Sequence, residues 1–236
     1  MMKQMMRNSN GMGRGLLIAA LLVVGLAVAG PANADVFNFT SCHLSDGCGT
    51  ATQFGTVTLT QSGTSVLFDV VLNSGNRFVE TGAGGGELFL FNDSIATSTI
   101  TGITATLNGA TVAITGGLTG LTGISPAVHA DGTGDFTASV ECTTDASCNG
   151  GSTPNINDLH FTVTNATLAQ LETANANGNL FVADILCGAT QPQCNGLTGP
   201  VDVSTPGTRV PEPASLAIFG TALAGLGLIR RRRKNA

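Results

Sequence analysis

The stretch FGTVTLTQSGTSVLFDVVL (Phe54–Leu72) has the alternating pattern of two β-strands joined by a turn. Val57 and Leu59 alternate with threonines, and the segment QSGT at 61–64 can form the turn. The second run then places four apolar residues on one face: Val66, Phe68, Val70 and Leu72. A hydrophobic period of two is typical of strands with one buried face. The stretch therefore predicts an antiparallel hairpin.

The same pattern recurs along the chain and predicts the fold class. A second hairpin is expected over 103–114, where Asn108-Gly109 suits the positive φ angles of a type I′ turn. Further strands are predicted at 88–92, 136–140, 159–165 and 179–187. About eight short antiparallel strands predict an all-β fold, an antiparallel β-sandwich.

One short connecting helix is predicted between the last two of these strands. Thr167 can cap its start, Gln170 completes a capping box, and Gly178 lies just past its end. The segment GGLTGLTGI at 116–124 has too few Leu-Thr-Gly copies for a solenoid. It is interpreted as a loop or an edge strand.

The N-terminus has the pattern of a secretory signal peptide. Basic residues precede an apolar run at 16–29, which is too short to span a hydrocarbon core of about 30 Å comfortably. The small residues Ala32 and Ala34 follow it and predict cleavage before Asp35. We therefore assign 1–34 to a signal peptide and 35–209 to one exported domain. An uncleaved anchor is the alternative.

Residues 35–209 are strongly acidic. They contain ten Asp, four Glu, two Arg and no Lys, which gives a net charge of 2 minus 14, or −12. An acidic body repels phosphate backbones, so no nucleic acid is expected as a partner. We interpret the charge as a solvated surface that favours solubility, in preference to a cation-binding face.

All six cysteines lie in the exported part and fall into close pairs. Six cysteines allow fifteen connectivities, but the polar, turn-rich segments between the pair members favour three local disulfides in an oxidising compartment. A zinc site with His43 is the alternative, and the spacing matches no zinc-finger pattern. The predicted pairs are Cys42 with Cys48, Cys142 with Cys148, and Cys187 with Cys194.

The sequence shows no catalytic motif. It has neither G-x-S-x-G nor H-E-x-x-H, and its histidines are His43, His129 and His160. His160 is interpreted as a surface group of a strand. Asp131 and Asp135 in HADGTGDF could flank a calcium ion, but a solvated glycine loop is the favoured interpretation. We expect no catalytic residues, no metal, no cofactor and no enzymatic activity.

Two further polar features leave alternatives open. The segment NANGN at 175–179 resembles part of an EF-hand loop, but Gly178 is fourth instead of sixth and Leu186 replaces the bidentate Glu. A glycosidase needs two facing carboxylates. Whether any two glutamates of the body face each other depends on the strand pairing, which the sequence does not show. These glutamates are Glu80, Glu87, Glu141 and Glu172.

The C-terminus, VPEPASLAIFGTALAGLGLIRRRRKNA at 210–236, combines three features. These are the motif Pro211-Glu212-Pro213, an apolar segment at 214–229 and a basic cluster at 230–234. The prolines keep the motif extended and out of helices and central strands. The apolar segment predicts a short transmembrane helix of about 24 Å, whose arginines snorkel and hold that end in the cytoplasm.

This tail resembles the PEP-CTERM sorting signal of Gram-negative bacteria, which has the same three parts in the same order and is read by an exosortase. The body resembles exported proteins that carry such tails through FGTVTLT, DLHFTVTN and NLFVADILC. The resemblance implies an exosortase-type processing enzyme as partner, and a location at the cell surface or in the extracellular matrix. It also implies anchoring, at least transient, by the C-terminal helix.

A structural protein associated with exopolysaccharide is the function expected from that location. The alternative is a carbohydrate- or calcium-binding surface module. The chain lacks Trp and Tyr, which are the usual flat platforms for sugars, and this counts against the first of these ligands.

Overall fold

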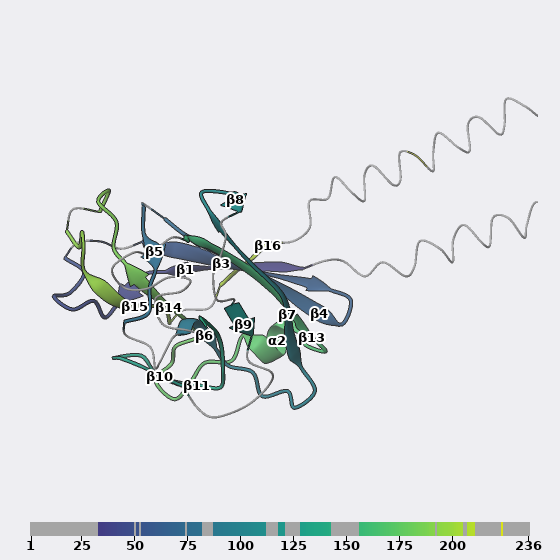
Figure 1. Cartoon of the computed structure of the whole chain (residues 1–236). Helices are drawn as coiled ribbons and strands as arrows, with labels where there is room; N and C mark the ends of the chain where they lie inside the picture. Colours follow the sequence, from purple (N-terminus) through teal and green to yellow (C-terminus); the bar gives the residue numbers. More distant parts are fainter. Residues whose placement is uncertain are drawn as a thin grey trace, which may run out of the picture. The chain divides into compact units, whose positions relative to one another are not determined.

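The computed structural model confirms the predicted all-β class, and its described residues form two antiparallel sheets, a separate hairpin and one short helix (Figure 1). The predicted apolar run at 16–29, and the predicted transmembrane segment at 214–229 except Leu223, lie outside the residues that the structure describes. Those residues are 33–49, 51, 53–73, 75–81, 87–111, 118–120, 128–142, 156–191, 193–204, 207–210 and 223.

The first sheet has the strand order β16-β1-β3-β4-β13-β7-β8, and all its neighbours are antiparallel. The stretch that predicted the fold forms its β3–β4 hairpin, with Gly55 opposite Leu72. In the β7–β8 turn, Asn108 and Gly109 have φ angles of 51° and 78°, as predicted for a type I′ turn. The strands are β1 (Ala34–Phe39), β3 (Gly55–Ser62), β4 (Ser65–Leu72), β7 (Thr99–Leu107), β8 (Ala110–Thr111), β13 (Asp158–Thr164) and β16 (Thr208–Val210).

The second sheet has the order β2-β15-β14-β6-β12-β9, and β5 also pairs with β14. The predicted loop or edge strand at 116–124 supplies its edge strand β9. The strands are β2 (Ser41–Cys42), β5 (Arg77–Phe78), β6 (Glu87–Phe91), β9 (Leu118–Gly120), β12 (Ala138–Cys142), β14 (Phe181–Leu186) and β15 (Thr198–Val203).

The main core lies between the two sheets and is built around phenylalanine rings. Phe68 of β4 is at its centre, with its ring stacked on Phe161 at a centroid distance of 4.5 Å. Phe89 and Phe91 of β6 and Phe181 of β14 contact the same ring from the second sheet. Aromatic burial of this kind contributes about 1 kcal/mol per ring pair beyond the buried area. The rings therefore join the two sheets.

A third layer covers part of the outer face of the second sheet. It is the hairpin of β10 (Val128–Ala130) and β11 (Gly134–Phe136). Ala130 and Phe136 form a small second core with Leu90 and Val182, whose side chains leave the main core on the opposite face of their sheet. This explains why β6 and β14 are buried on both faces.

The helix is shorter than the sequence predicted. Helix α2 (Leu168–Leu171) has the predicted capping box, in which the Thr167 backbone N–H donates to Gln170 Oε1 at 3.0 Å. It ends well before Gly178, because the side chain of Asn175 accepts backbone hydrogen bonds that form a turn over 175–179.

Candidate functional site

The two predicted processing boundaries lie side by side in the fold. β1 begins at Ala34, the last residue of the predicted signal peptide, and β16 ends at Val210, the residue before the Pro-Glu-Pro motif. Because the two strands are antiparallel, Ala34 is the register partner of Val210, and Asp35 is the partner of Arg209. Both ends of the exported domain therefore share one pair of residues at the edge of the first sheet.

The start of β1 is built into the sheet on both sides. Ala34 also pairs with Thr60 of β3, and the Gln61 N–H donates to the Asn33 carbonyl at 2.9 Å. Asp35, the predicted first residue of the mature protein, is only 3 % exposed. A peptide bond held this way cannot enter a peptidase, so cleavage after Ala34 requires β1 to be undocked.

Two of the three predicted disulfides lie among the described residues. Cys42 is bonded to Cys48, and Cys187 is bonded to Cys194. Their loops lie against each other, because a Cβ added to Gly49 would come within 2.6 Å of Gln193 Cβ. The side chain of Gln191 also donates to the Gln53 carbonyl at 2.7 Å. The predicted pair Cys142–Cys148 lies partly outside the described residues.

His43, the histidine beside Cys42, contacts a buried carboxylate. Its Nε2 is 3.4 Å from Asp202 Oδ1, and Asp202 is only 2 % exposed. Burial raises the pKa of Asp202 above its ordinary value near 3.8, and this effect outweighs the opposing influence of the neighbouring Ser41 and His43 side chains. Within the part of the chain that the structure describes, no group of three or more His, Cys, Asp or Glu residues could hold a metal ion.

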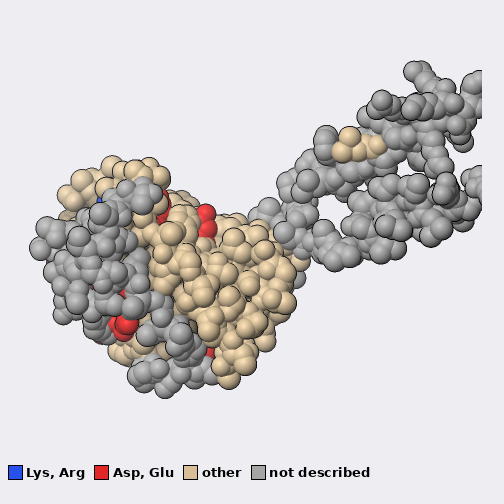
Figure 2. Space-filling view, turned by 45° about the vertical axis from the view of Figure 1, so that its right-hand side comes forward, with Lys and Arg blue, Asp and Glu red and all other residues tan. Residues whose placement is uncertain are grey.

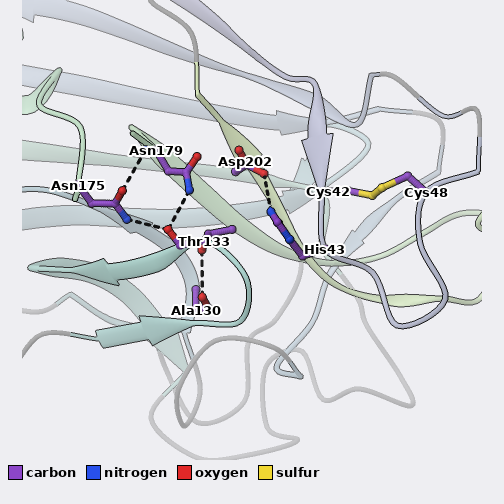
Figure 3. A network of polar contacts seen from close by, with 8 residues as sticks. All are labelled: Cys42, His43, Cys48, Ala130, Thr133, Asn175, Asn179 and Asp202. Atoms are coloured by element: carbon purple, nitrogen blue, oxygen red, sulfur yellow. Dashed lines mark hydrogen bonds and ion pairs between the residues drawn. A yellow bond between two sulfur atoms is a disulfide. The ribbon is translucent and has the colours of Figure 1, made fainter. Parts of the chain in front are cut away.

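The loops HADGTGDF and NANGN, which are distant in sequence, pack against each other (Figure 3). The side-chain amides of Asn175 and Asn179 both donate to the Thr133 carbonyl, at 2.9 and 2.8 Å. Asn175 Oδ1 in turn accepts the backbone N–H groups of Asn177 and Asn179. These amide groups hold the β10–β11 turn on the sheet. Their hydrogen bonds are made to groups of the same chain, and they are not arranged as the ligands of an EF-hand.

His43 holds the same turn from the other side. A Cβ added to Gly132 would come within 2.3 Å of His43 Nδ1, so the imidazole lies directly against this glycine. The exposed pair His129 and Asp135 contact each other at 2.8 Å across the hairpin. The loop proposed as a weak calcium candidate is thus organised by contacts to His43, Asn175 and Asn179.

His160 lies on the outer face of the first sheet, as predicted for a surface group. Its Nδ1 is 3.1 Å from Asp69 Oδ1 on the neighbouring strand β4. Gly102 of β7, at φ +62°, lies where the pairing of β13 with β7 shifts register. An open groove of about 340 Å³ lies over this point. Its exposed lining is mainly apolar, and the polar residues that border it are Thr58, Thr60, Asp69, His160 and Thr162.

Strand pairing also brings two glutamates opposite each other. Glu87 of β6 is the register partner of Glu141 of β12, next to an irregularity in the pairing. Glu87 is 7 % exposed. The sequence could not show this neighbourhood, because the residues come from strands that are distant in the chain.

On the face shown in Figure 2, the described surface consists mainly of uncharged residues, with isolated acidic ones between them. This view agrees with the interpretation of the acidic composition as a solvated surface.

Residues 209–234 match the PEP-CTERM protein-sorting motif. No curated protein and no solved structure matches the chain. The PEP-CTERM motif supports an exported, cell-surface protein that is sorted by an exosortase.

The PEP-CTERM tail begins inside the folded body, because its first two matched residues, Arg209 and Val210, belong to β16. Sequence reasoning placed the start of the tail at 210 and did not predict β16. The structure adds that this strand connects the tail to β1. None of the helices in the described ranges is long and apolar enough to cross a bilayer, and the predicted segment at 214–229, apart from Leu223, falls outside those ranges.

Proposed function

We propose that this protein is a non-catalytic structural component of the cell surface or extracellular matrix, released from the membrane when its PEP-CTERM tail is removed. The observation that carries the proposal is the register pair Ala34–Val210. A signal-peptide cut and a tail cut would both act at one edge of the sandwich and would leave the body between them intact.

The non-catalytic part of the proposal is supported by polar side chains that already contact other groups of the same chain. His43, Asn175 and Asn179 contact buried or backbone groups of the same chain. A catalytic base or a metal ligand needs an unoccupied position that faces its substrate or ion. These side chains instead stabilise the β10–β11 turn.

Tail removal breaks one peptide bond near Pro211-Glu212-Pro213, and the acyl group passes to water or to an acceptor amine. Replacing Glu212 by Ala, or deleting 230–234, should leave unprocessed protein in the membrane fraction. C-terminal mass spectrometry of surface-extracted protein provides the measurement. If peptides from 216–230 remain attached in the mature protein, the segment is a permanent anchor and the proposal is wrong.

A glycan-binding surface module is the second candidate, favoured by the groove on the first sheet. Threonine hydroxyls, Asp69 and His160 offer donors and acceptors there, and Leu67, 43 % exposed, offers an apolar contact. The acidic body favours a neutral glycan over an anionic one. The mature protein should then bind a neutral-glycan array and lose that binding in His160→Ala. His129→Ala, which removes another exposed histidine paired with an aspartate, is the matched control.

A further inference from the structure

The strand β16 is the last part of the body before the sorting motif. It lies at the edge of the first sheet, and among the described residues β1 is the strand with which it pairs. Three register pairs hold it: Ala34 with Val210, Asp35 with Arg209, and Val36 with Thr208. Pro211 follows Val210 directly in the sequence.

An enzyme that cuts near this proline must bind the residues before the cut. Enzymes and other proteins that recognise extended peptides do so largely through main-chain hydrogen bonds. The main chain of 208–210 is already paired with β1. Backbone engaged in a ladder is also protected from proteolysis until it opens locally.

We propose that β16 is a latch on the PEP-CTERM tail, and that the processing enzyme binds the tail only after β16 has separated from β1. This inference rests on the proposed removal of the tail. Separation is local, because a three-residue edge strand can leave its sheet while the β3–β4 hairpin and the aromatic core stay in place.

The register also couples the two processing events. Ala34 is the residue that the predicted signal-peptide cut removes, and its partner Val210 is the residue nearest the sorting motif. Cleavage after Ala34 therefore deletes the outermost of the three pairs and leaves Val210 without its strand neighbour. The N-terminal cut should come first and should make the tail easier to process.

A cross-link between β1 and β16 tests the latch in the full chain. Val36→Cys combined with Thr208→Cys places two thiols at one register pair, where Cα atoms lie about 4.5–5.5 Å apart, within the range of a disulfide. The matched control is Thr56→Cys with Val71→Cys, a register pair of β3 and β4 in the same sheet. The readout is the mass of the C-terminus in cell fractions, with each single-cysteine variant measured in parallel.

The oxidised Val36→Cys/Thr208→Cys protein should keep its tail, with processing at least tenfold slower than in the control cross-link and in the single variants. Processing of the locked protein at the control rate would overturn the latch while leaving tail removal established. If the wild type and the control also keep the tail, the proposed release from the membrane fails, and the latch fails with it.

The coupling has a separate test. Two full-length proteins are exported behind a foreign signal peptide, one cut before Asp35 and one cut before Asn33. The second retains the Ala34–Val210 pair and the hydrogen bond from Gln61 to Asn33. It should lose its tail several-fold more slowly. Equal rates would show that Ala34 has no part in the latch.

Discussion

At the scale of single residues, a small number of side chains fix the loops on the outer face of the second sheet. Asn175 uses both ends of its amide, since Nδ2 donates to the Thr133 carbonyl and Oδ1 accepts two backbone N–H groups. His43 contributes packing against Gly132 and a contact with the buried Asp202. Loss of His43 leaves the buried Asp202 without this contact, and loss of Asn175 leaves the part-buried Asn179 N–H without its acceptor. An unpartnered polar group costs more free energy the more deeply it is buried.

Asn175→Ala should lower the free energy of unfolding by about 1–3 kcal/mol. It removes three hydrogen bonds, although the Thr133 carbonyl keeps its bond from Asn179. Asn177→Ala, in the same exposed turn, removes none of those side-chain bonds and should change stability by less than about 0.5 kcal/mol. Urea unfolding followed by far-UV circular dichroism measures both. Equal losses in the two variants would contradict the role assigned to Asn175.

The free energy of unfolding of Asp202→Asn, relative to that of the wild type, should increase as pH rises from about 4 to 7. The pKa of Asp202 is raised in the folded protein, so its protonated form favours folding. That contribution is fully present below pH 3.8 and is lost as pH rises through the folded-state pKa. Asparagine does not ionise and avoids the loss. Urea midpoints of both proteins across this pH range provide the check. If the midpoint of the variant falls relative to that of the wild type as pH rises, the assignment is refuted.

At the scale of elements, the first sheet depends on a backbone irregularity in β7. Gly102 has a positive φ angle at the point where the register between β7 and β13 shifts. A Cβ added there would meet no atom within 4 Å, so the constraint is purely conformational. This bulge places the groove beside His160.

Gly102→Ala should therefore destabilise the protein by about 1–2 kcal/mol, the cost of a left-handed backbone for a residue with a Cβ. Thr101→Ala, in the same strand and exposed, serves as the control and should stay within about 0.5 kcal/mol of the wild type. Thermal unfolding monitored by circular dichroism is the measurement. A Gly102→Ala protein as stable as the control would show that the bulge tolerates other residues.

How far the sequence predicts an element depends on how local its cause is. The β3–β4 and β7–β8 hairpins were predictable because alternation and turn residues lie within one short stretch. Strand β15 was not predicted, since TGPVDV contains a proline and only a weak alternation. Strand β16 was missed because three residues carry no periodicity.

The candidate sites divide in the same way. The capping box and the local disulfides follow from residues a few positions apart. The contacts His43–Asp202, Asn175–Thr133 and Glu87–Glu141 join residues far apart in the chain, and only the register of the sheets brings them together. No single-sequence pattern encodes that register.

At the scale of the whole molecule, stability comes from the layered core more than from the cross-links. Each disulfide closes a small loop, worth about 2 kcal/mol in the chain-entropy model. The ring contacts of the phenylalanine cluster span both sheets and involve no cysteine, although Cys187 and Cys194 are buried in the same core. The body should therefore survive reduction.

Non-reducing peptide mapping of the exported protein should recover three local links, Cys42–Cys48, Cys142–Cys148 and Cys187–Cys194. Reduction should lower the melting temperature while the far-UV spectrum remains that of a β-protein, since a domain of this size buries enough apolar surface to fold without disulfides. Cross-links between the pairs would contradict the assignment, as would a random-coil spectrum after reduction.

The pairing of Ala34 with Val210 has a practical consequence for protein engineering. Ends that lie next to each other in one ladder can be joined by a short flexible linker without distorting the sheet. New ends could then be opened at the exposed Gly63 turn between β3 and β4, where a Cβ would meet no atom within 4 Å. Such a circular permutant would carry the sandwich without either targeting segment. It would make the β3–β4 turn, which lies at the same end of the first sheet as the Ala34–Val210 pair, the attachment point for a fused cargo.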